Sequence, residues 1–205
     1  MPQDPSVAHD HDLPIAHDHG HAPATGPLAG ASTRIARPND ASAVGLVQAA
    51  VWRAAYGAVL PREVVDRFDA SSFARVWRDS LNTPPSPRHV LLVSCTGEQV
   101  VGFAAVGPSI DRDATDTSGE VLALGVHPDA RRSGHGSRLL NAAVDTLRDK
   151  GFSSMCVWLL VRDEDTRTFL TVAGLSPDGA YRDRVIDDAG ILAREVRLTA
   201  DLALD

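Results

Sequence analysis

Residues 130–140 read ARRSGHGSRLL and lie between the strand-like run LALGVH (122–127) and a segment with helical spacing of apolar residues. A helix N-terminus presents unpaired backbone N–H groups and about half a positive charge. Glycine lacks the Cβ that would hold an anion away from these groups. Arginine binds phosphate oxygens through two parallel hydrogen bonds. The stretch therefore predicts a diphosphate-binding site at the start of a helix.

Two common phosphate-binding motifs do not fit this stretch. The nucleotide-binding loop requires a Gly-Lys-Ser/Thr sequence, which does not follow here. The dinucleotide-binding motif GxGxxG fails at its last glycine, because Leu139 stands at that position. The spacing that remains is Arg131-x-x-Gly134-x-Gly136.

The segments around this motif change between helical and strand periodicity. Their order is β-α-α-α-β-β-β-α-β-α-β-β, which predicts a mixed sheet flanked by helices rather than a repeated βαβ unit. The expected strands are 32–38, 89–95, 99–107, 120–128, 153–161 and a closing hairpin over 184–198. The expected helices are 39–60, 61–68, a segment that begins at 71 or 72, 136–151 and 163–174.

The R-x-x-G-x-G spacing, placed after LALGVHP and before an amphipathic helix, resembles the acetyl-CoA-binding motif of the GNAT N-acetyltransferase superfamily. The resemblance extends over about residues 33–199 and includes VWRAAYGAVLP (51–61), EVLALGVHP (120–128) and FLTVAGL (169–175). It implies an α/β (α+β) fold with a mixed, mostly antiparallel sheet flanked by helices and splayed between strands 4 and 5. It also implies direct transfer of an acetyl group from acetyl-CoA, the co-substrate, to a primary amine of a protein lysine or a small molecule, with no metal required.

The resemblance also implies which residues hold the coenzyme. The fourth strand would offer backbone groups of Leu124 and Val126 to the pantetheine arm, and Gly125 would mark a bulge that opens the slot beside this strand. The pyrophosphate would lie on the N–H groups of residues 132–137. The full set expected to bind the coenzyme is Leu124, Val126, Arg131, Arg132, Ser133, Gly134, His135, Gly136, Ser137, Asp163 and Phe169.

Catalysis in this family needs a base for the amine proton and an acid for the leaving thiolate. Glu120 stands where many members carry a carboxylate base that acts through water. The family pattern N-x-x-A-x-x-F-Y-x-x-x-G-F matches DEDTRTFLTVAGL (163–175), so Leu170 replaces the usual tyrosine acid. Tyr56 is the expected substitute, with core packing beside Trp52 as its structural alternative. Tyr181 and a bound water are further candidates.

Composition limits the classes of partner. The formal net charge of −7 argues against nonspecific nucleic-acid binding, which requires a basic face. No apolar run reaches the roughly 18 residues of a membrane span, and no signal-peptide pattern is visible. Cys95 and Cys156 form neither a CxxC pair nor a disulfide framework, which suits a reducing compartment. We expect a cytoplasmic monomer or homodimer whose partners are acetyl-CoA and an amine, not a nucleic acid or a membrane.

Residues 1–30 differ in composition from the remainder. They hold four aspartates and five of the eight histidines, without Lys or Arg, and little that could form a core. We expect a disordered tail at 1–30 and the acetyltransferase domain at 31–205. Two alternatives stay open at this point: a non-catalytic CoA-binding regulatory module, and a metal-binding protein that acts through its His-rich tail.

Overall fold

The computed structural model describes residues 30–57, 60–185, 190 and 192–202. The expected tail at 1–30 therefore falls almost wholly outside the described residues. The strands are β1 Ala31–Ile35, β2 Val90–Thr96, β3 Gln99–Pro108, β4 Ser118–Val126, β5 Ser154–Leu160, β6 Ser176–Val185 and β7 Leu192–Asp201. The helices are α1 Ala41–Tyr56, α2 Arg62–Val65, α3 Ala70–Asn82, α4 His135–Asp149 and α5 Glu164–Val172. This order confirms the one predicted from periodicity.

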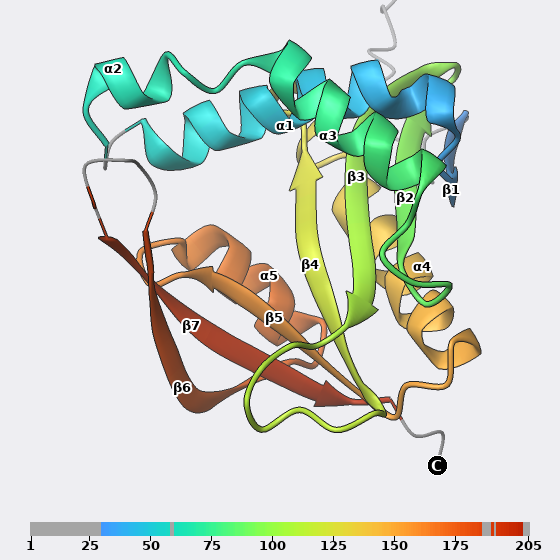
Figure 1. Ribbon diagram of the computed structural model, residues 1–205, viewed down its shortest axis with the longest axis vertical. Coiled ribbons are helices and arrows are strands. Elements are labelled where there is room, and N and C mark those ends of the chain that lie inside the picture. Colours follow the sequence, from blue (N-terminus) through green and yellow to red (C-terminus); the bar gives the residue numbers. More distant parts are fainter. Residues whose placement is uncertain (1–29, 58–59, 186–189, 191, 203–205) are drawn as a thin grey trace, which may run out of the picture.

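The seven strands form one sheet in the order β1-β2-β3-β4-β5-β7-β6. Among the described strands, β4 and β5 are the parallel neighbours, and every other pair is antiparallel. The parallel pairing joins residues 118–121 to 154–157 and then stops. Beyond that point the two strands diverge (Figure 1). The predicted mixed, mostly antiparallel sheet, splayed between strands 4 and 5, is therefore confirmed.

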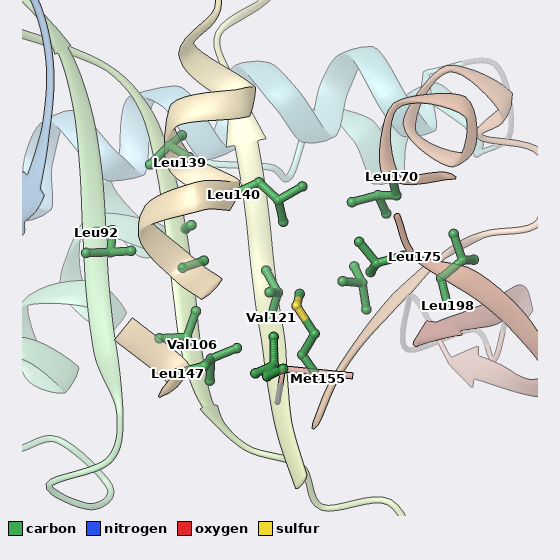
Figure 2. Packing of buried hydrophobic residues seen from close by; sticks show 14 of the residues in the cluster. Leu92, Val106, Val121, Leu139, Leu140, Leu147, Met155, Leu170, Leu175 and Leu198 are labelled. Atoms are coloured by element: carbon green, nitrogen blue, oxygen red, sulfur yellow. The ribbon is translucent and has the colours of Figure 1, made fainter. Parts of the chain in front are cut away.

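Helices cover both faces of the sheet. On one face, α1 and α3 lie across β2, β3 and β4, and on the other α4 packs against β2, β3 and β4 (Figure 1). Leucines of α4 at positions 139, 140 and 147 repeat with helical spacing and are buried in one core cluster that also contains Val106 and Val121 (Figure 2). Burial of each such side chain contributes roughly 1.5–3 kcal/mol. Of the helices that the model describes, none has the length and hydrophobicity needed to cross a membrane.

Two local expectations are corrected. The closing hairpin begins at Ser176 rather than near residue 184, because β6 is an exposed edge strand without the alternation that signals burial. The bulge in β4 falls at Leu122, where the register shifts between Ala105 and Val106 of β3. Gly125 is paired regularly with Phe103. A Cβ on Gly125 would lie 3.0 Å from that ring and 3.2 Å from Val51, so this glycine lets α1 approach the sheet closely.

Candidate active site

The start of α4 presents a continuous row of free backbone donors. Gly134 is the N-cap, with φ of +77°, and Arg132 also lies in the left-handed region, with φ of +60°. The first hydrogen bond of the helix runs from Arg138 N–H to the Gly134 carbonyl. The N–H groups of residues 132–137 donate to no acceptor among the described residues. Such a concave row of N–H groups at a helix N-terminus is suited to an anion.

The arginines of the motif leave this row accessible. Arg131 and Arg132 are exposed, and their contacts are a 3.4 Å hydrogen bond to the Val126 carbonyl and a 3.7 Å ion pair with Asp165. Arg138 donates to the carbonyl of Ser133 at 3.3 Å. Ser133 is half-buried, and Ser137 is exposed on the first turn of α4. The loop therefore combines free amides with solvent-accessible guanidinium groups.

The open edge of β4 lies next to this loop. The N–H of His127 bonds to the carbonyl of Val101 in β3. Because backbone bonding alternates along an antiparallel pair, the N–H and C=O groups of Leu124 and Val126 point away from β3. These groups point into the space between β4 and β5, where the two strands are no longer paired. An extended ligand in that space would require backbone groups with this orientation.

Residues of α5 complete the surroundings of the loop. The ring of Phe169 would lie 3.6 Å from a Cβ on Gly136, so it borders the first turn of α4. Asp163 caps α5 by accepting a 3.0 Å hydrogen bond from the N–H of Thr166. Leu170 is fully buried in the core with Leu140 and Leu175 (Figure 2). At this position the site offers a packed hydrophobe and no proton donor.

His135 contributes to the loop through its backbone only. Its side chain is 2% exposed and turns toward β2, where Nδ1 lies 2.7 Å from Ser94 Oγ and Nε2 lies 3.1 Å from Thr96 Oγ1. Burial, followed by the charge of Arg138, lowers the pKa of His135. The neutral ring therefore ties the first residue of α4 to the sheet. Of the groups of His135, the backbone N–H is therefore the one that could bind the coenzyme.

Substitution of His135 by leucine should destabilise the fold. The change leaves the buried hydroxyl group of Ser94 without its partner, and an unsatisfied buried polar group costs about 1–3 kcal/mol, whereas the hydroxyl of the exposed Thr96 can bond to water. Urea unfolding should show a loss of this size. Adding Ser94→Ala and Thr96→Val removes the unpaired groups and should recover most of it. A triple variant as unstable as His135→Leu alone would contradict this role.

Glu120 lies on the face of the sheet opposite α4. It is 5% exposed, and its Oε2 has no hydrogen-bond partner among the described residues. Burial raises its pKa, and the negative charge of Asp111 raises it further. Its cross-strand neighbour in β5 is Cys156. A desolvated carboxyl group with a raised pKa is suited to accept a proton near neutral pH.

A network of ion pairs, which the sequence patterns did not reveal, borders Glu120. Glu195 of β7 is 4% exposed and accepts from Arg182 at 2.6 Å and from Arg184 at 3.4 Å. Arg197 bonds to Asp111 in the β3–β4 loop. It also forms ion pairs with Asp113 and Asp178, and its hydrogen bond holds the pKa of Asp113 at about 2. The alternation in AREVR (193–197) indicated a strand. It could not indicate which residues pair with the charged side chains of this strand, because those residues come from segments distant in the sequence.

The two tyrosine candidates lie in different places. Tyr56 ends α1 and is 9% exposed in an aromatic cluster, with its ring 5.8 Å from that of Trp52. Burial raises its pKa. Leu160, at the end of β5 that has separated from β4, packs against this cluster. Tyr181 pairs with Val196, whose side chain packs against the core on the α4 side of the sheet. Because paired residues point to the same face, Tyr181 points away from Glu120, which argues against Tyr181 as the acid.

Comparison with known proteins agrees with this geometry. The uncharacterized N-acetyltransferase YuaI of Bacillus subtilis (strain 168) is 26% identical over 167 residues, which are 82% of this chain and 91% of YuaI. YncA of Salmonella typhimurium, solved with acetyl-CoA, has a TM-score of 0.63 and 19% identity, covering 85% of this chain and 95% of its own. The PaiA N-acetyltransferase of Thermoplasma acidophilum, solved with coenzyme A, has a TM-score of 0.64 and 14% identity, covering 82% and 98%. The model of the acetyltransferase (GNAT) family matches residues 50–169, and the chain belongs to that family.

Proposed function

We propose that this protein transfers an acetyl group from acetyl-CoA to a primary amine of a small molecule or a protein lysine. The observation that carries the proposal is the row of free N–H groups at residues 132–137 beside the open edge of β4. The row would hold the pyrophosphate, and Leu124 and Val126 would bond to the pantetheine arm. The thioester would then lie in the slot between β4 and β5. The structures of YncA with acetyl-CoA and PaiA with coenzyme A support this assignment.

The transfer itself has a defined balance of bonds and protons. The neutral amine attacks the thioester carbonyl, the new C–N bond forms, and the C–S bond breaks. Glu120 takes the proton that the amine loses, directly or through water, and its buried Oε2, which has no hydrogen-bond partner among the described residues, supports this role. The thiolate that leaves must receive a proton from an acid.

Tyr56 is the proposed acid. Its raised pKa keeps the phenol protonated, as proton donation requires. Glu195 raises the pKa of both Tyr56 and Glu120, so one charged group acts on the proposed acid and the proposed base alike.

The Tyr56→Phe variant should lower kcat by about 10²-fold, the lower end of the range for general acid catalysis, with little change in KM for acetyl-CoA. The phenyl ring keeps the contacts with Trp52 and Phe68, so thermal unfolding should stay near that of the wild type. Steady-state kinetics with both substrates varied would measure the change in kcat separately from the change in KM for each substrate. An unchanged kcat would assign Tyr56 to packing alone and leave solvent as the proton source.

A thiol-release assay against a panel of amines tests the function as a whole. The panel should include a polyamine, free amino acids, arylamines and lysine peptides, with acetyl-CoA as donor. Release of free coenzyme that depends on one acceptor class, with acetylated product confirmed by mass spectrometry, is the expected result. Tight coenzyme binding without turnover on any acceptor would instead favour a non-catalytic CoA-binding module.

We also propose a cytoplasmic location. Cys95 and Cys156 are both free and buried, which is compatible with a reducing compartment.

A further inference from the structure

Three side chains of metal-ligand type converge beside the proposed base. Asp111 comes from the β3–β4 loop, Glu120 from β4 and Cys156 from β5, and one ligand atom of each lies within 4.8 Å of the other two. Glu120 and Cys156 are 5% and 6% exposed. Three separate elements therefore aim carboxylate and thiol groups at one buried point.

Independent observations indicate that a cation would be favoured at this point. Oε2 of Glu120 is buried without a hydrogen-bond partner among the described residues. The surrounding network contains five carboxyl groups and three guanidinium groups, so it has a surplus of acidic groups. The carboxyl groups are those of Asp111, Asp113, Glu120, Asp178 and Glu195, and the guanidinium groups are those of Arg182, Arg184 and Arg197.

The geometry around Asp111 is that of an oriented metal ligand. Oδ2 of Asp111 accepts from Trp158 Nε1 at 3.0 Å and from Arg197 at 2.9 Å, which fixes the carboxylate. Ligating carboxylates are commonly held by such hydrogen bonds. Of the three side chains, Cys156 lines a cavity of about 130 Å³ together with Ser109 and Arg197, and this cavity has room for a water ligand.

We propose that Asp111, Glu120 and Cys156 form a site for a divalent cation that binds thiolate, of the Zn²⁺ class, and that the cation inhibits acetyl transfer by coordinating the base. Zn²⁺ binds sulfur at about 2.3 Å and carboxylate oxygen at about 2.0–2.2 Å, so tetrahedral ligands lie roughly 3.4–3.6 Å apart. Cys156 Sγ is already 3.9 Å from Asp111 Oδ2. A contraction of at most roughly 1.2–1.4 Å at the widest ligand pair would bring all three side chains into bonding distance of the ion, with water as the fourth ligand.

The chemistry of binding and its consequence are simple. The Cys156 thiol loses its proton to solvent as the metal–sulfur bond forms, so binding should strengthen as pH rises. Coordination occupies the Glu120 oxygen that would accept the amine proton. Inhibition rests on the proposed function, whereas metal binding does not. A thiolate ligand distinguishes the site from Mg²⁺ or Ca²⁺ sites, which use oxygen ligands.

Cadmium titration of the full-length protein tests the site without any activity measurement. Cd²⁺ bound to thiolate gives a ligand-to-metal charge-transfer absorbance, whereas Cd²⁺ on the histidines of residues 1–30 does not. We expect a band that corresponds to one thiolate per chain. Cys156→Ser should abolish it, and Cys95→Ser, at the other buried cysteine, should keep it. A band absent from the wild type, or retained in Cys156→Ser, overturns the site.

Zinc inhibition tests the consequence. In the wild type, Zn²⁺ should lower kcat, because it blocks the proposed base, and leave KM for acetyl-CoA unchanged. Cys156→Ser should retain basal turnover and need at least about 10-fold more Zn²⁺ for half-inhibition, since loss of a ligand's hydrogen-bond partner alone typically costs about 10–100-fold in metal affinity. Cys95→Ser should behave as the wild type. Equal inhibition of all three proteins overturns the inhibitory role, and a protein without turnover that still shows the Cys156-dependent cadmium band contradicts the proposed function instead.

Discussion

The Gly136→Asp variant is expected to lose acetyl-CoA binding by at least about 10²-fold while it keeps its fold. A Cβ at this position would lie 3.6 Å from the Phe169 ring and 3.9 Å from Val126, which are ordinary contacts, so the protein itself tolerates a side chain there. The added carboxylate would instead stand among the free N–H groups of α4 and repel the pyrophosphate. Calorimetric titration with acetyl-CoA measures the loss, and circular dichroism verifies the fold.

Two companion variants separate the causes. Gly136→Ala adds bulk without charge and should weaken binding less than aspartate does. Asn141→Asp adds the same charge to an exposed position more than one turn further along α4, and it should leave affinity nearly unchanged. Gly134 is a poorer test position, because its φ of +77° would strain the backbone of any replacement and so confound a loss of affinity with a change in the loop. Near-wild-type affinity in a folded Gly136→Asp protein would mean that the coenzyme does not bind at the N-terminus of α4.

Local periodicity predicted the fold because each buried segment carries its own signal. The leucines of α4 repeat with helical spacing, and β2, β3 and β5 are continuous apolar runs. The glycine-rich loop could be recognised for the same reason, because the anion binding proposed for it depends on backbone groups within one short stretch. β6 carried no such signal, since an exposed edge strand with Pro177 and Gly179 has no buried face to pattern.

The charged part of the site could not be predicted in this way. Glu195, Arg182 and Arg197 come together only because β6 and β7 pair beside β5, and their ion pairs join residues far apart in sequence. The direction of single side chains was also hidden. His135 lies within the motif yet turns toward Ser94, and Leu170 occupies the family's tyrosine position yet belongs to the core.

Two buried carboxylates in this network have opposite consequences for stability. Glu195 is 4% exposed and paired with Arg182 and Arg184, so Glu195→Gln should destabilise the protein by leaving charged partners without a counterion. Glu120 is equally buried but unpaired. Its ionised form is opposed by desolvation and by the charge of Asp111, and together these outweigh the support that it receives from Arg182 and Ser109. A buried carboxyl group whose ionised form destabilises the fold is expected at a functional site, where a reaction requires its shifted pKa.

The Glu120→Gln variant should therefore lose activity and gain stability. Without the base, kcat should fall about 10²–10⁴-fold, while KM for acetyl-CoA stays near the wild-type value because the amide leaves the α4 loop untouched. In the wild type, activity should decline as pH falls through the raised pKa of Glu120, and that acid limb should lie above the ordinary range of a glutamate. The variant's residual rate should lack this limb.

The stability of the two proteins should diverge with pH in a fixed direction. Because the folded-state pKa of Glu120 is raised, its protonated form contributes stability below the unfolded-state pKa, and this is lost as pH rises through the folded-state value. Above that range the wild type carries a buried, unpaired carboxylate, whereas Glu120→Gln carries a neutral amide. Urea unfolding at several pH values should show the variant's advantage growing from acid to neutral pH. Wild-type turnover in Glu120→Gln would assign the base elsewhere, and parallel stability profiles would mean that Glu120 is not a strained carboxylate in the folded protein.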